Sequence, residues 1–170
     1  MNIGVHQGDI THTPKPVQAI ITPINSGGMW FGGIDRAIMR TAGSQYHAQA
    51  QKSLGRIKQN DTIRATRKAV HDGHFTEVLF VIDDLESPLS DVIFASLKAA
   101  EEATYRMVAM SAMRTGVMLG SVEKTLRETV QQMRIGFDRF REAYPDSHLN
   151  VLIVVYSNTE LVDLINELVL

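Results

Sequence analysis

The sequence predicts an α/β protein, a three-layer α/β/α sandwich with a mixed, largely parallel sheet. Two observations carry this prediction. Apolar, strand-like runs alternate with helix-like segments along most of the chain, a pattern typical of a sheet covered by helices on both faces. Two glycine-bearing loops follow such runs, so we expect both at the carboxyl edge of the sheet, where ligands bind in folds of this class.

Length and composition limit the classes of protein that fit. A chain of 170 residues buries a sizeable core, and we expect a single domain over residues 1–170. A net charge of −2 excludes the basic surface of a duplex nucleic acid binder, and the absence of cysteine excludes disulfides and a cysteine nucleophile. Neither a signal peptide nor an apolar run of membrane length is present, so we expect a cytoplasmic protein without a membrane partner. The oligomeric state is not predicted.

The strands are recognised as short apolar or β-branched runs between turn residues. They are expected at residues 2–6, 17–22, 62–70, 77–82, 106–110 and 149–156. The run at 17–22 is almost continuously apolar, which indicates burial on both faces.

The helices are recognised by apolar residues that recur every three or four positions. They are expected at residues 34–42, 44–54, 122–144 and 159–170, and in a further segment that begins after residues 87–90 and ends at about residue 103. The segment 122–144 has the most regular spacing, so it predicts an amphipathic helix whose apolar stripe packs into the core. Ser121 is expected to cap its N-terminus and Pro145 to end it.

The first glycine loop, residues 25–35, places four glycines within residues 27–33, between a strand and a helix. Glycine lets the backbone approach a ligand closely, and the free N–H groups and the dipole of the helix favour an anion. The loop therefore predicts a phosphate-binding site, with simple turn chemistry as the alternative. Asn25 and Asp35 at its two ends suit a hydroxylated ligand. A second loop, residues 111–120, follows another strand.

The remaining polar residues give no sign of a metal site. The spacing of histidines and carboxylates matches no metal-binding motif, so we expect neither a metal nor a cofactor. Asp83 and Asp84 after a buried strand are either a polar strand end or a pair of Mg²⁺ ligands. The six histidines are expected on the surface or in loops.

Four segments resemble the macro domain, the ADP-ribose-binding module. Residues 8–11 are similar to its GDIT motif, and residues 20–25 occupy the place of its V-N-A-A-N strand end. Residues 32–43 match its GG-V-D-x-A-I-x-x-A-A-G segment, and residues 115–118 resemble its second phosphate loop. The segments occur in the order found in the family, so the resemblance extends over essentially the whole chain and implies a macro-domain-like sandwich.

The resemblance also implies a ligand, ADP-ribose or an ADP-ribosylated protein, and the residues that contact it. Asp9, beside the backbone of Ile10, would accept a hydrogen bond from the adenine amino group, and Asn25 would bond the distal ribose. The other implied contacts are Gly32, Gly33 and Ile34 in the first diphosphate loop, Thr115, Gly116, Val117 and Met118 in the second, Tyr156 against the adenine, and Asn158 as a polar contact.

Enzymes of this family hydrolyse ADP-ribose from acidic side chains, and the resemblance implies Asn25 and Asp35 as the catalytic residues. Asp35 would orient or activate the water that attacks the anomeric carbon of the ribose. The alternative role of Asp35 is a negative charge that complements the helix dipole. Removal of the terminal phosphate from ADP-ribose 1″-phosphate, and recognition of ADP-ribose without catalysis, are alternative functions of the same pocket.

Three departures from the family pattern favour a further alternative. Thr22 replaces an asparagine, Phe31 stands where a glycine is common, and Met118 replaces an aromatic residue. These changes are expected in a protein-interaction domain whose pocket has decayed. In such a domain, Trp30 and Phe31 would form an interaction patch, whereas in a nucleotide-binding domain they would form a wall of the pocket.

Overall fold

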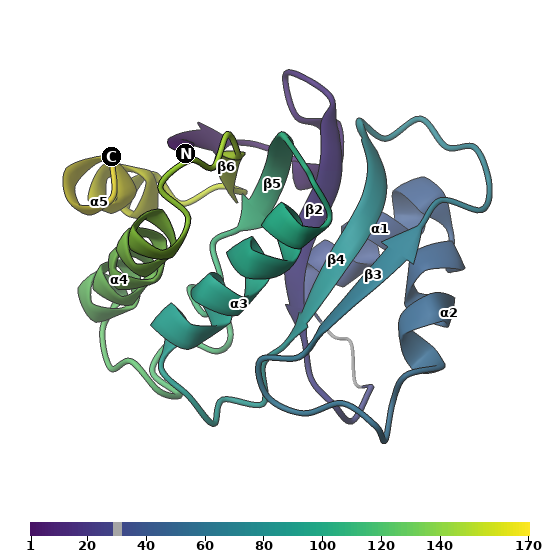
Figure 1. The fold of residues 1–170 in the computed structure, drawn as a ribbon, viewed down its shortest axis with the longest axis horizontal. Helices are drawn as coiled ribbons and strands as arrows, with labels where there is room; N and C mark the ends of the chain where they lie inside the picture. The colour runs from purple at the N-terminus through teal and green to yellow at the C-terminus, as the bar shows by residue number, and fades with distance from the viewer. Residues whose placement is uncertain (29–31) are drawn as a thin grey trace.

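The computed structural model describes residues 1–28 and 32–170, which form a three-layer α/β/α sandwich around a six-stranded sheet (Figure 1). The strand order is β1-β6-β5-β2-β4-β3, and every pair is parallel except β3 with β4. The strands are β1 (Asn2–Gln7), β2 (Val17–Ile24), β3 (Thr62–Thr66), β4 (Phe75–Ile82), β5 (Met107–Ser111) and β6 (Asn150–Val155). The helices are η1 (Ile10–His12), α1 (Gly33–Ala42), α2 (Gln45–Gln51), α3 (Leu89–Glu102), α4 (Leu126–Ala143) and α5 (Thr159–Leu168). The predicted fold class is confirmed.

The core lies in two apolar layers, one on each face of the sheet. Helices α1 and α2 cover one face, and α3, α4 and α5 cover the other (Figure 1). Successive side chains of a strand point to opposite faces, so Ile20 of β2 packs under α1 and α2, whereas Ile21 packs under the other three helices. The sheet is therefore buried on both sides at β2, as its continuous apolar run predicts.

The N-terminus of α4 differs from the prediction. The helix begins after Thr125 rather than after Ser121, because Thr125 Oγ1 accepts a hydrogen bond from the Glu128 backbone N–H at 3.1 Å. The Glu128 carboxylate accepts in return from the backbone N–H of Lys124 at 2.7 Å. This reciprocal arrangement is close to a capping box, and the sequence pattern Thr-x-x-Glu contained its signal. The predicted end before Pro145 is confirmed.

Two other elements end three or more residues before their predicted limits. The predicted strand 62–70 ends at Thr66, because the following backbone turns away from β4 and donates to the side chain of Gln45 from Lys68 and Ala69. The predicted helix 44–54 gives way after Gln51 to turns with hydrogen bonds three residues apart. In both cases local side-chain and turn bonding outweighs the periodic pattern.

Gly136 lies at the crossing of α4 and α3, where no larger residue fits. A Cβ atom at this position would lie 2.7 Å from Ile93 Cβ and 2.9 Å from the Ser90 carbonyl oxygen. We expect Gly136→Ala to lower the free energy of unfolding by about 1–3 kcal/mol, measured by urea denaturation, because it overpacks this contact. An increase of about 1 kcal/mol, the gain in helix propensity alone, would contradict the close approach.

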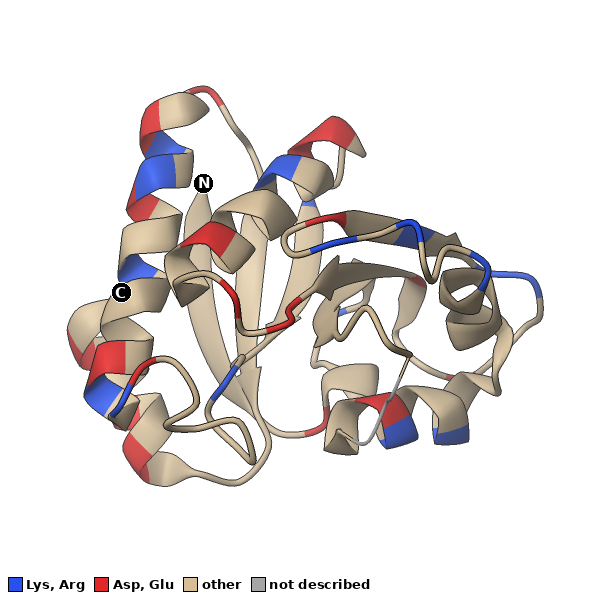
Figure 2. Cartoon of the chain, turned by 90° about the horizontal axis from the view of Figure 1, so that it is seen from below, with Lys and Arg blue, Asp and Glu red and all other residues tan. Residues whose placement is uncertain are grey.

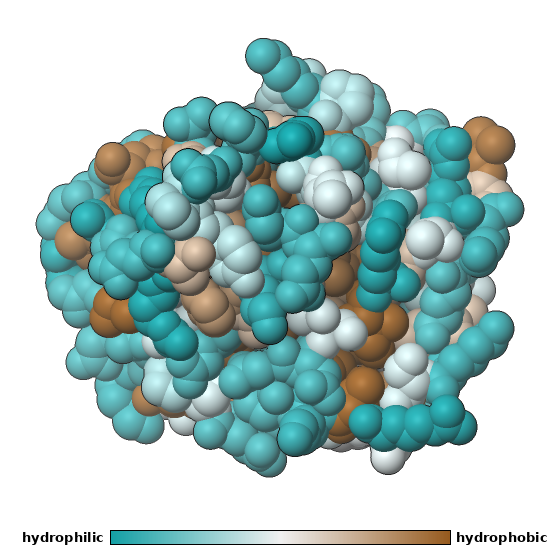
Figure 3. Space-filling model, viewed as in Figure 1, coloured by the Kyte–Doolittle hydropathy of each residue, from teal (hydrophilic) through white to brown (hydrophobic). Residues whose placement is uncertain are grey.

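The surface carries charges of both signs. Lys and Arg are interspersed with Asp and Glu along the helices in Figure 2, in keeping with the net charge of −2. The face shown in Figure 3 is mostly hydrophilic, with apolar residues in small separate groups. Within residues 1–28 and 32–170, no helix has the length and apolar character needed to cross a membrane.

Candidate functional site

A cavity of about 670 Å³ lies at the carboxyl edge of the sheet, between the start of α1 and the loop that follows β5. The strand order puts the ends of β1 and β6 at one side of this cavity and the ends of β5 and β2 at the other. Of the predicted site residues, those that line it are Asp9, Ile10, Gly32, Gly33, Ile34, Asp35, Thr115, Gly116, Val117, Met118, Tyr156 and Asn158. Both glycine loops therefore face one cavity of a size typical of small-molecule sites.

The first loop presents open backbone to the cavity. A Cβ atom on Gly33, the first residue of α1, would meet no atom of the described residues within 4 Å, and the N-cap Gly32 has no side chain to bond the helix N–H groups. Asp84, just after β4, fixes the beginning of the loop, because its Oδ1 accepts from the Ser26 backbone N–H at 2.8 Å. The helix N–H groups and dipole beside Gly33 suit an anion.

Asp35 is buried in the first turn of α1 and pairs with His47 of α2. Asp35 Oδ1 lies 2.8 Å from His47 Nε2, and the His47 ring packs edge-on against Phe80 of β4. Asp35 Oδ2 lies beside the backbone of Gly32, 3.2 Å from the position that a Cβ there would take. One carboxylate oxygen is thus bonded inside the protein while the residue lines the cavity.

Asn25 is not among the residues that line the cavity, although Thr22 and Pro23 of the same strand are. It follows β2, and its backbone carbonyl accepts from the Gly28 N–H at 3.3 Å. Its predicted contact with the distal ribose stays a prediction. The predictions for Trp30 and Phe31 fall outside the described residues.

The second loop is anchored by Arg114, a buried residue with a left-handed backbone conformation (φ 58°). Its guanidinium donates to both oxygens of Asp83 at 2.7 and 2.8 Å, to both oxygens of Glu123 at 3.0 and 3.1 Å, and to the Ser87 carbonyl. Burial alone would lower the pKa of Arg114, but the bonds and charges of Asp83 and Glu123 outweigh it and raise that pKa. Asp83 and Asp84 thus form a polar strand end, in which Asp84 fixes the first loop and Asp83 fixes the second.

Beyond Arg114 the loop turns its backbone and apolar side chains outward. The Thr115 hydroxyl donates to the Ala112 carbonyl at 2.6 Å, and a Cβ on Gly116 would meet nothing within 4 Å in the part of the chain that the structure describes. Val117 is 89% exposed and Met118 is 48% exposed, and both line the cavity. Tyr156, which follows the neighbouring strand β6 and also lines the cavity, is 81% exposed. Exposed apolar side chains therefore form part of the cavity rim.

Asp9 lies between β1 and η1 and caps this short helix. Its Oδ1 accepts from the Thr11 backbone N–H at 2.8 Å and from the Thr11 hydroxyl at 2.7 Å. Burial alone would raise the pKa of Asp9, but the Thr11 hydrogen bonds and the nearby charges of His12 and Arg40 outweigh it and hold that pKa below its usual range. Asp9 is therefore ionised at neutral pH and suits a hydrogen-bond donor such as an amino group.

Asn158 caps α5, accepting from the Leu161 N–H at 3.1 Å.

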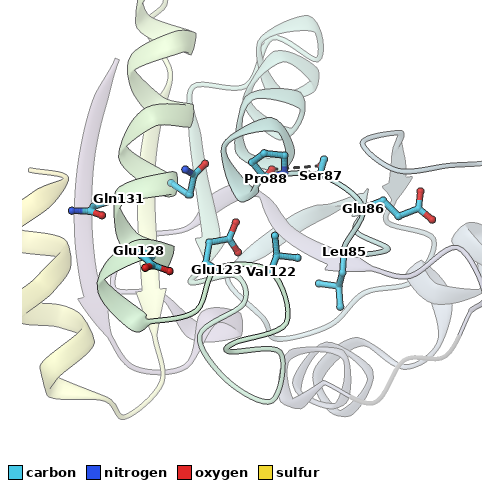
Figure 4. Close-up of a pocket in the computed structure, with 9 residues that line it drawn as sticks. Leu85, Glu86, Ser87, Pro88, Val122, Glu123, Glu128 and Gln131 are labelled. Carbon is cyan, nitrogen blue, oxygen red and sulfur yellow. Dashed lines mark hydrogen bonds between the residues drawn. The ribbon is translucent and has the colours of Figure 1, made fainter.

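A second cavity, of about 480 Å³, lies between the turn before α3 and the start of α4 (Figure 4). It is lined by Leu85, Glu86, Ser87, Pro88, Val122, Glu123, Glu128, Gln131 and Gln132. Three of these residues are glutamates and none is basic, so the cavity does not suit a phosphate. Glu123 is shared with the Arg114 anchor, which places this cavity on the reverse side of the second loop.

Among the residues placed by the structure, no group of three histidines or carboxylates could hold a metal ion.

The structure adds four residues that sequence reasoning missed: His47, Ser111, Arg114 and Glu123. His47 was expected on the surface or in a loop, and this expectation is wrong, since it lies buried in α2. Arg114 stands directly before Thr115 in the sequence, but only the fold brings it to Asp83.

These features define an α/β domain in which two glycine loops and an aromatic residue border one cavity. A family model for the macro domain matches residues 21–129. Because this match covers more than half of the chain, the chain belongs to the macro domain family. A search of curated proteins finds no match.

Solved macrodomain structures share the fold. One is the Trypanosoma brucei macrodomain in complex with ADP-ribose, with a TM-score of 0.78 and 17% identity over 98% of this chain and 68% of that one. Another is the Oceanobacillus iheyensis macrodomain with ADP, with a TM-score of 0.75 and 15% identity over 96% of this chain and 87% of that one. The macro domain of ganglioside induced differentiation associated protein 2 has a TM-score of 0.75 and 14% identity, with coverage of 98% and 83%. At these identities the likeness establishes the fold.

Proposed function

We propose that this macro domain binds ADP-ribose, free or linked to protein, in the cavity between its two loops. The observation that carries the proposal is the convergence on one cavity of Gly33 at a helix N-terminus, the open Gly116 backbone, the anionic Asp9 and the exposed ring of Tyr156. Backbone N–H groups suit phosphate oxygens, a carboxylate suits an exocyclic amine, and an aromatic ring suits the face of a base.

The strand order supports one orientation of the ligand. Asp9 and Tyr156 follow β1 and β6, at one side of the sheet, so the adenine lies there. The two loops follow β5 and β2, so the diphosphate lies between them and the distal ribose near Asp35. The experiment is isothermal titration calorimetry with ADP-ribose. Absence of binding heat at high ligand concentration would remove the proposal and leave the protein-interaction alternative.

We propose further that the domain hydrolyses ADP-ribose from modified proteins. The buried position of Asp35 supports this reaction, because His47 holds one carboxylate oxygen while the residue lines the cavity. Asp35 takes a proton from a water, the water oxygen bonds to the anomeric carbon, and the bond from that carbon to the side-chain oxygen breaks. The products are free ADP-ribose and the unmodified side chain. Asn25 is proposed to orient the distal ribose from the end of β2.

Asp35→Asn tests this role. We expect the rate of ADP-ribose release to fall at least about 100-fold, since a positioned general base contributes about 10²–10⁴-fold, while the affinity for ADP-ribose changes little. Release is measured by mass spectrometry of a mono-ADP-ribosylated protein, and affinity by calorimetry.

Asp91→Asn is the matched control, because Asp91 lies in the first turn of α3 as Asp35 does in α1. If Asp35 only complements a helix dipole, both variants would change the stability of the fold, and ADP-ribose would still be released from the modified protein at the wild-type rate. Wild-type protein that binds ADP-ribose but does not remove it from the modified protein would identify a module that recognises ADP-ribose without catalysis. Wild-type protein that dephosphorylates only ADP-ribose 1″-phosphate would identify the phosphatase.

A further inference from the structure

Ser111, the last residue of β5 and the first of the predicted second loop, is a buried residue on the wall of the proposed ADP-ribose cavity. It is 2% exposed and lines the cavity together with Thr22 of β2. Its hydroxyl oxygen has no hydrogen-bond partner within the described part of the chain. A hydroxyl taken out of water without a partner costs free energy, so a position of this kind is normally filled by an apolar side chain.

Three other buried hydroxyls of the chain, in α3, in α4 and before β6, are bonded internally. Ser96 in α3 donates to the Val92 carbonyl at 2.7 Å, and Ser147 donates to Glu101 at 2.6 Å. Thr129 in α4 donates to the Thr125 carbonyl at 3.0 Å. Ser111 differs from these three residues, because its hydroxyl bonds no described residue.

The register of the sheet places Ser111 on the side of the ligand. In β5, Met110 packs under α3, α4 and α5, whereas Ala109 packs under α1 and α2, so Ser111 shares the α1 face with Ala109. Ile21 of β2 pairs with Met110, which brings Thr22 beside Ser111. Two hydroxyl-bearing residues thus lie side by side near the carboxyl ends of β2 and β5, and both line the cavity that the two glycine loops border.

We propose that Ser111 is a ligand-recognition residue whose hydroxyl bonds an oxygen of the group held between the two loops. The oxygen belongs to the diphosphate or to the distal ribose, and the contact is direct or passes through one water. The inference rests on the proposed binding of ADP-ribose. A hydroxyl both donates and accepts, so it suits a phosphate oxygen and a ribose hydroxyl equally. The uncompensated hydroxyl of the free protein is compensated when the ligand enters.

The test is Ser111→Ala, with affinity and thermal stability measured on the same protein. We expect the dissociation constant for ADP-ribose to rise about 3- to 20-fold, the effect of losing one net hydrogen bond. The unfolding midpoint should stay the same or rise, because the variant removes an unpaired buried hydroxyl. A penalty for both ADP-ribose and ADP assigns the contact to the diphosphate, and a penalty for ADP-ribose alone assigns it to the distal ribose.

Ser96→Ala is the matched control, a buried serine bonded within its helix and remote from the cavity lining. It should lower the unfolding midpoint and leave affinity unchanged. The inference is overturned if Ser111→Ala behaves like this control, or if it binds ADP-ribose as tightly as the wild type. Wild-type protein without ADP-ribose binding would refute the proposed function, and the inference with it.

Discussion

Arg114→Met is expected to lower the free energy of unfolding by about 3–5 kcal/mol, because it leaves two buried carboxylates without their cation. The side chains of Arg114, Asp83 and Glu123 are 2%, 5% and 6% exposed, so water cannot replace the lost partner. Methionine keeps the apolar volume of the arginine stem and has a Cβ like arginine, so the strain of the left-handed backbone is unchanged. Urea denaturation followed by circular dichroism measures the loss.

Arg127→Met is the control for this prediction. Arg127 also bonds a carboxylate through two nitrogens, but its side chain and that of its partner Glu167 are 51% and 55% exposed. A surface pair of this kind contributes about 0–1 kcal/mol. Similar small losses in the two variants would show that the Arg114 anchor does not stabilise the fold.

Gly33→Glu is expected to abolish ADP-ribose binding, raising the dissociation constant at least about 100-fold while the protein remains folded. A side chain at Gly33 has open space among the described residues, and a carboxylate in the first turn of α1 complements the helix dipole, so stability should be maintained. The same carboxylate occupies the place proposed for the diphosphate and repels it. Calorimetry with ADP-ribose and a thermal melt of the same sample measure the two effects.

Gly33→Gln separates charge from bulk. Glutamine has nearly the size of glutamate without its charge, so a markedly smaller loss of affinity is expected. Equal losses would assign the effect to volume alone. Undiminished affinity in Gly33→Glu would contradict the placement of the diphosphate at the start of α1.

Much of the architecture was predictable, because the spacing of apolar residues along the sequence indicates which face of a strand or helix is buried. The continuous apolar run of β2 and the three-and-four spacing of α4 depend on which face each residue buries, and both were recovered. The ends of elements were less predictable, since they depend on single hydrogen bonds. Thr125 rather than Ser121 caps α4, and the Gln45 side chain draws the backbone after Thr66 away from the sheet.

The candidate site divides in the same way. Loop residues such as Gly33 and Gly116 were predicted from the sequence alone, because glycine in a loop that follows a strand lets the backbone approach a ligand closely. The supporting residues were not, because their roles depend on contacts across the sheet. His47 meets Asp35 only when α2 packs beside α1, and Arg114 meets Asp83 from 31 residues away in sequence.

The end of β4 offers a way to redesign the cavity. Asp83 holds Arg114 and Asp84 holds Ser26, so adjacent carboxylates on one turn anchor both loops that border the cavity. Lengthening or shortening this turn is expected to displace the anchored residues of both loops, whereas changing a glycine alters only one loop. A bulkier or smaller nucleotide is therefore best accommodated by remodelling residues 83–88, far in sequence from every proposed ligand contact.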